Sequence, residues 1–114
     1  MKHFLTKSNP GLRDLQAFHE ALDRDKGFDV DMLRNIAYLS EEVGEVVTAI
    51  RALQEAENPA ELDAARADLG EELADCLAYI LKLANYGGVA LEDAYVKKMQ
   101  HNIDRTWSKA RRGG

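Results

Sequence analysis

The sequence predicts an all-α domain, a four-helix bundle with two long central helices, and three observations lead to this fold class. Apolar residues recur at the 3.6-residue spacing of a helix through most of the 114 residues. The chain has only two prolines and few turn-forming clusters. The clusters that do occur separate the periodic segments cleanly. We therefore expect one domain, residues 1–114, with flexible ends at 1–10 and 109–114.

The first two helices are predicted from their apolar stripes and their ends. The first covers about 12–26, and Gly27 is placed to end it. The second runs to about residue 56, and either Asp29 or Asp31 can cap its start. Its apolar stripe is the longer and clearer of the two, which predicts a central position in the bundle.

The last two helices follow two strong local signals. Asn58 can cap a helix, Pro59 suits its first position, and Glu61 stands where a capping-box acid belongs. This third helix is expected to end near Tyr86, before a Gly-Gly pair. A fourth helix is predicted at about 90–108.

Composition and charge exclude several classes of partner. The formal net charge of −5 argues against a nucleic-acid polymer, since binding to phosphate backbones needs a positive surface. No stretch approaches 18 consecutive apolar residues, and the N-terminus lacks a long apolar segment, so neither a membrane span nor secretion is expected. We expect a cytoplasmic protein.

The two central helices repeat one acidic pattern at an offset of thirty residues. It reads Glu41-Glu42-x-x-Glu45 in the first copy and Glu71-Glu72-x-x-Asp75 in the second. A helical wheel places Glu42 and Glu72 at the edge of the apolar face, their i+3 partners one step out, and the leading glutamates further round. The pairs Glu42/Glu45 and Glu72/Asp75 can therefore converge across one groove if the helices pack side by side.

Such a convergence requires a cation. Two like charges about 4 Å apart repel by roughly 4 kcal/mol at an effective dielectric constant near 20. Ligation by carboxylate oxygens alone favours Mg²⁺ first and Mn²⁺ second. Carboxylate di-iron chemistry is excluded because no histidine follows a glutamate by three residues. The alternative interpretation is a solvated acidic helix face without a metal.

A strip of small residues lies on a further side of both central helices. Its members are Ala37, Ser40, Gly44 and Thr48 on one helix, and Ala67, Gly70, Ala74 and Ala78 on the other. Four helices of this length hardly cover both the apolar and the small side of each central helix. We therefore expect self-association as a homodimer or homotetramer.

Taken with the segment Lys98-Met-Gln-His-Asn102-Ile-Asp-Arg105, these motifs resemble the MazG-like all-α nucleotide pyrophosphohydrolases. The resemblance covers about residues 33–107. It implies Mg²⁺-dependent hydrolysis of a nucleoside triphosphate to the monophosphate and pyrophosphate, as nucleotide-pool house-cleaning. It also implies that Glu42, Glu45, Glu72 and Asp75 are metal ligands and that Glu41 orients the attacking water or acts as general base.

The remaining site residues are predicted from position and type. Lys98, Asn102 and Arg105 share one helix face and are candidates for the polyphosphate, with Lys82 a lesser one. Candidate nucleobase contacts are Phe18, Phe28 and Trp107, although aromatic residues at helical spacing more often belong to a core. Nothing in the sequence selects among dUTP, dCTP, oxidised and standard nucleotides.

Two alternatives to this function stay open. Phosphoribosyl-ATP pyrophosphohydrolases have a similar pair of acidic helices. A non-catalytic helical regulatory module that binds a divalent ion would show the same acidic repeat.

Overall fold

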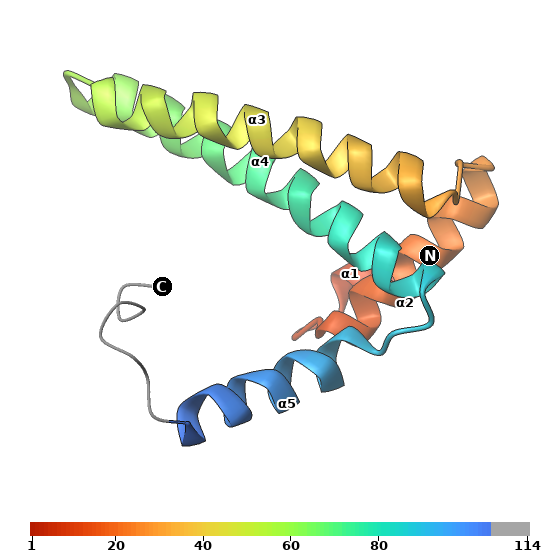
Figure 1. Cartoon of the computed structure of the whole chain (residues 1–114). Helices are drawn as coiled ribbons and strands as arrows, with labels where there is room; N and C mark the ends of the chain where they lie inside the picture. Colours follow the sequence, from red (N-terminus) through yellow and green to blue (C-terminus); the bar gives the residue numbers. More distant parts are fainter. Residues whose placement is uncertain (106–114) are drawn as a thin grey trace.

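A computed structural model describes residues 1–105, and these residues form only helices and the loops between them (Figure 1). The helices are α1 (His3–Thr6), α2 (Leu12–Lys26), α3 (Met32–Glu55), α4 (Pro59–Tyr86) and α5 (Leu91–Asp104). The all-α class and the two long central helices are as predicted. The short α1 lies in the segment for which we expected flexibility, and the predicted end of the last helix lies outside the described residues.

Local capping interactions fix the helix boundaries. At α3 the choice falls on Asp31, whose side chain accepts a hydrogen bond from the Arg34 backbone N–H. At α4 the Asn58 side chain accepts from the Glu61 N–H at 2.9 Å, with Pro59 at the first helical position. Gly27 ends α2 in the left-handed conformation, with φ 64°, which a residue with a side chain rarely adopts.

Helices α3 and α4 form a long antiparallel hairpin, the main packing unit of the chain (Figure 1). Between residues 39 and 76, the least exposed residues of the two helices recur at alternating spacings of three and four, as in a coiled-coil seam. On α3 they are Leu39, Glu42, Val46, Ala49 and Leu53, and on α4 they are Leu62, Ala65, Leu69, Glu72 and Cys76. The seam therefore includes one glutamate from each helix.

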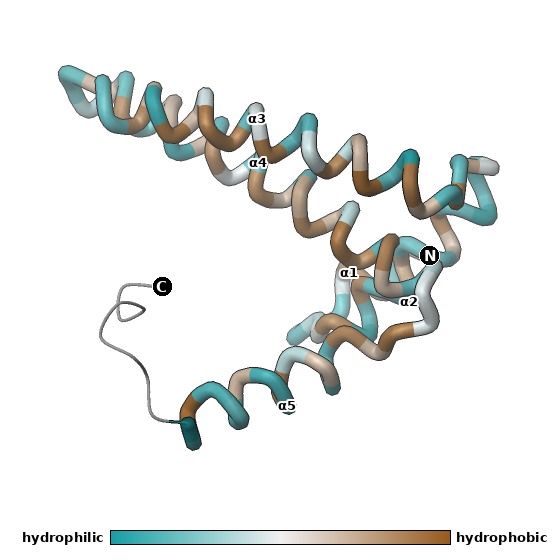
Figure 2. The backbone as a smooth tube through the Cα atoms, viewed as in Figure 1, coloured by the Kyte–Doolittle hydropathy of each residue, from teal (hydrophilic) through white to brown (hydrophobic). Residues whose placement is uncertain are grey.

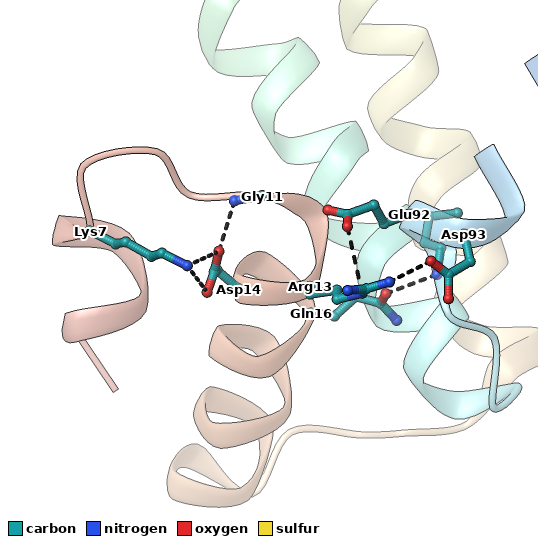
Figure 3. A network of polar contacts seen from close by, with 8 residues as sticks. Lys7, Gly11, Arg13, Asp14, Gln16, Glu92 and Asp93 are labelled. Carbon is teal, nitrogen blue, oxygen red and sulfur yellow. Dashed lines mark hydrogen bonds and ion pairs between the residues drawn. The ribbon is translucent and has the colours of Figure 1, made fainter. Parts of the chain in front are cut away.

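Helix α2 packs across α4 at the open end of the hairpin and also holds the start of α5. Arg13 forms ion pairs with Asp93 and, at 3.5 Å, with Glu92 (Figure 3). Gln16 accepts from the Leu91 backbone N–H at 3.0 Å. From this anchor α5 runs away from the α3–α4 pair (Figure 1).

The hydrophobic core within a single chain is small. Among residues 1–105, four hydrophobic residues are buried, namely Ala49, Ala65, Leu81 and Ala84. Apolar residues instead continue along the visible sides of α3 and α4, while the loop that joins them is hydrophilic (Figure 2). Within the same residues, no helix combines the length and the apolar character needed to cross a membrane.

Candidate metal and nucleotide site

Three of the four predicted metal ligands come together at the middle of the hairpin. Glu42 of α3 and Glu72 and Asp75 of α4 each offer a carboxylate oxygen, and the three oxygens lie within 4.8 Å of one another. Glu42 and Glu72 are half-buried in the seam, whereas Asp75 is exposed. We call these three residues the acidic cluster.

The acidic cluster has the electrostatics of a site that attracts a cation. The pKa of Glu72 is raised, first by burial and then by its hydrogen bond to Glu42 and by the charges of Glu42, Glu45 and Asp75. Glu45 therefore lies close enough to act on Glu72, although it is not in the cluster itself. A donor set made only of carboxylate oxygens fits a hard divalent ion, so these residues could hold one.

The leading glutamates of both motifs point outward. Glu41 and Glu71 are exposed. Glu41 still lies within range of the site, because its charge is among those that raise the pKa of Tyr79, after burial, Glu42, Tyr38 and Asp75. Glu71 has no comparable interaction among the described residues.

A small pocket opens beside the acidic cluster, towards the open end of the hairpin. It has a volume of about 190 Å³ and is lined by Phe28, Asp29, Asn35, Tyr38, Tyr79 and Lys82. The Tyr38 and Tyr79 rings meet across the groove at a tilt of 49°, with their centroids 6.0 Å apart. We call this cavity the aromatic pocket.

Of the six residues that line the pocket, only Phe28 and Lys82 were predicted for the site, although a signal for the two tyrosines existed. Tyr38 stands four residues before Glu42, and Tyr79 stands four residues after Asp75. Each tyrosine is therefore one helical turn from an acid of the cluster and on the same side of its helix.

Lys82, a candidate for the polyphosphate, lies in the wall of the aromatic pocket. Its ammonium nitrogen is 3.3 Å from Oδ1 of Asp23, a buried residue of α2. It also lies over two aromatic rings, 5.2 Å from the Phe28 centroid and 5.3 Å from the Tyr79 centroid. Asp23 was not among the residues predicted for the site.

The other predicted contacts lie apart from the acidic cluster in this chain. Lys98 and Asn102 are on α5, which packs on α2 and runs away from the hairpin (Figure 1). Arg105 was predicted on the same helix face, but it follows the helix end at Asp104 in extended backbone. Phe28 lines the aromatic pocket, but Phe18 is not among its described lining residues and packs edge-on against His19. Trp107 lies outside the described residues.

Comparison with known proteins assigns the family. The model of the MazG nucleotide pyrophosphohydrolase domain matches residues 30–107 of this chain. The matched range spans both acidic motifs and α5. A search of curated proteins found no match.

Proposed function

We propose, because the chain belongs to the MazG nucleotide pyrophosphohydrolase family, that it cleaves a nucleoside triphosphate between the α and β phosphates. The products are the nucleoside monophosphate and pyrophosphate, and the role is removal of unwanted nucleotides. The observation that carries the proposal is the convergence of Glu42, Glu72 and Asp75 on one point of the groove. A solvated acidic face would have no reason to place two of its members in a helix seam.

In this proposal the acidic cluster, joined by Glu45, binds Mg²⁺, with Mn²⁺ as a substitute. When bound, Mg²⁺ neutralises charge on the phosphate oxygens and increases the acidity of water. Glu41, exposed beside the cluster, takes the proton of the attacking water. The water oxygen bonds to the α-phosphorus, and the bond from that phosphorus to the bridging oxygen breaks, so that pyrophosphate leaves.

The polyphosphate is assigned to Lys98, Asn102 and Arg105. Lys98 and Asn102 lie one turn apart on α5, and Arg105 directly follows the end of this helix. Because α5 runs away from the acidic cluster of its own chain, we assign their contribution to a second copy of the protein (Figure 1). Lys82, the lesser candidate, lies in the wall of the aromatic pocket.

Self-association is supported by the apolar surface of the single chain. Leu33 is 80% exposed, and Val47 is 46% exposed. Further exposed apolar residues include Val43 and Ile50 on α3, Leu73, Leu77 and Ile80 on α4, and Tyr95, Val96, Met99 and Ile103 on α5. A surface of this kind marks an interface. The small residues Gly44 and Gly70 have open space around them, which leaves room for close approach by another helix.

The direct test is a nucleotide panel with Mg²⁺, in which pyrophosphate and orthophosphate are assayed separately. The panel includes standard, deoxy- and oxidised nucleoside triphosphates and phosphoribosyl-ATP. Pyrophosphate from at least one nucleoside triphosphate is the expected result. Release from phosphoribosyl-ATP alone would assign the chain to that reaction instead. Metal binding without any product would identify a regulatory module, and orthophosphate alone would exclude the proposed bond.

A further inference from the structure

A buried ion pair forms one wall of the aromatic pocket. Asp23 is 7% exposed and the Lys82 side chain 13% exposed. The second carboxylate oxygen of Asp23 accepts a hydrogen bond from the Tyr86 hydroxyl. Burial and this contact raise the pKa of Tyr86, which therefore remains protonated. Tyr86, at the end of α4, thus holds Asp23 in place, and Asp23 in turn holds Lys82 from α2.

This ion pair lies at a defined distance from the acidic cluster. Lys82 follows Asp75 by seven residues, which places it two turns, or about 10 Å, further along the same face of α4. Tyr79 stands between them. A nucleotide whose phosphates lie at the acidic cluster can therefore reach Lys82 with its base if it extends past Tyr79.

The size of the aromatic pocket suits a part of a nucleotide. Its volume of about 190 Å³ is below the roughly 300 Å³ at which sites for whole drug-sized ligands begin. Three aromatic rings line it, and aromatic rings are the surfaces on which a planar base stacks. The pocket is thus large enough for a single ring system, with the phosphates outside it.

The polar groups of the pocket are fixed before any ligand binds. Asn35 is 1% exposed, and its Nδ2 donates to the backbone oxygens of Asp29 and Asp31. The Lys82 ammonium has three donor hydrogens and no acceptor, and Asp23 occupies one side of it.

We infer that the aromatic pocket binds the nucleobase and that Lys82, positioned by Asp23, selects bases that carry a ring carbonyl oxygen. Uracil, thymine, cytosine and guanine offer such an oxygen to an ammonium donor. Adenine offers an amino group, itself a donor, beside its ring nitrogens. The inference rests on the proposed function, because the phosphates at the acidic cluster bring the base to this pocket. Lys82 thereby determines specificity, and Asp23 is its positioning residue.

The test measures binding of UMP and AMP by calorimetry, together with kcat and KM for UTP and ATP. The decisive variant is the double substitution Lys82→Met with Asp23→Asn, which removes both charges and leaves no unpaired buried ion. Gln16→Ala is the matched control, because Gln16 also joins α2 to α4, through Asn85, but does not line the pocket. Lys82→Arg retains the charge and tests for rescue.

Wild-type protein and Gln16→Ala are expected to bind UMP at least tenfold more tightly than AMP, and the double variant to bind both within about twofold. Asp23→Asn alone should raise KM for UTP more than it lowers kcat, and Lys82→Arg should restore part of the preference. An unchanged UMP preference in the folded double variant overturns the inference. Pyrophosphate release that persists in that case leaves the proposed function intact, whereas UMP selectivity without any turnover refutes the function and not the pocket.

Discussion

Glu42 and Glu72 occupy positions that a pair of packed helices ordinarily fills with apolar side chains. Their neighbours in the seam, such as Leu39, Val46 and Leu69, are half-buried residues of the usual kind. Two carboxylates placed there repel each other and lose part of their hydration. The two carboxylates thus destabilise the middle of the hairpin, and a divalent cation would neutralise their repulsion.

Substitution of a single acid separates the role of the acidic cluster in turnover from its role in folding. Glu42→Gln and Asp75→Asn are each expected to lower kcat/KM by at least about 100-fold, because the metal loses a ligand. The melting temperature without metal should stay unchanged or rise, since one repulsion is gone. Glu71→Gln, on the exposed face of the same motif, is the control and should keep its activity. Full activity in both cluster variants would place the metal site elsewhere.

The raised pKa of Glu72 predicts a pH dependence of stability in metal-free protein. The folded state binds this proton more tightly than the unfolded state, in which Glu72 has its usual pKa of 4.5. Its contribution is therefore fully present below about pH 4.5 and is lost as the pH rises through the higher folded-state value.

The measurement is the free energy of unfolding of wild type and Glu72→Gln across pH 4 to 8, with a chelator present. The stability advantage of the variant should increase with pH in that window. A constant difference between the two proteins would show that the pKa of Glu72 is the same in both states.

At the scale of the helix, capping determines where α4 starts and so the register of its acids. Two side chains accept backbone hydrogen bonds at that end of α4 among the described residues. Asn58 accepts from the Glu61 N–H, and Glu61 accepts from the Glu57 N–H. Asn58→Ala is expected to lower the free energy of unfolding by about 1 kcal/mol, measured by denaturant titration. Asn58→Asp keeps an acceptor oxygen and should lose little. Equal losses in the two variants would mean that the cap contributes nothing.

Helix boundaries could be predicted from the sequence because their causes are local. Gly27, Asp31 and Asn58 each act within about four residues of themselves, so their effect can be recognised without knowing the tertiary structure. The positions of Glu42 and Glu72 at the edge of the apolar face follow from periodicity for the same reason.

The aromatic pocket could not be predicted in this way. It depends on which residue of α3 meets which residue of α4, and a helical wheel contains no information on register between helices. The contact of Asp23 with Lys82 joins residues far apart in the sequence and depends on how α2 crosses α4. Lys82 was therefore recognised as a charge near the site, without its partner or its pocket.

At the scale of the whole molecule, the exposed apolar surface predicts a stable oligomer. Sedimentation at micromolar concentration should give a homodimer or homotetramer, and a stable monomer would contradict the proposal. Val47→Glu introduces a charge on the apolar side of α3 and is expected to shift the equilibrium towards monomer. Asn9→Glu adds the same charge in an exposed loop and should leave association unchanged.

Because Glu42 and Glu72 lie in the seam, binding of an ion there would also change how readily the hairpin opens locally. A ligand that binds only the folded state adds about 2.7 kcal/mol of stability at one hundred times its dissociation constant. An ion bound by the acidic cluster would stabilise the centre of the longest helix pair. Chelation should therefore speed amide hydrogen exchange around residues 42 and 72 before it affects the capped ends of α3 and α4. The hairpin would then report the free concentration of the ion through its local opening, whether or not substrate is present.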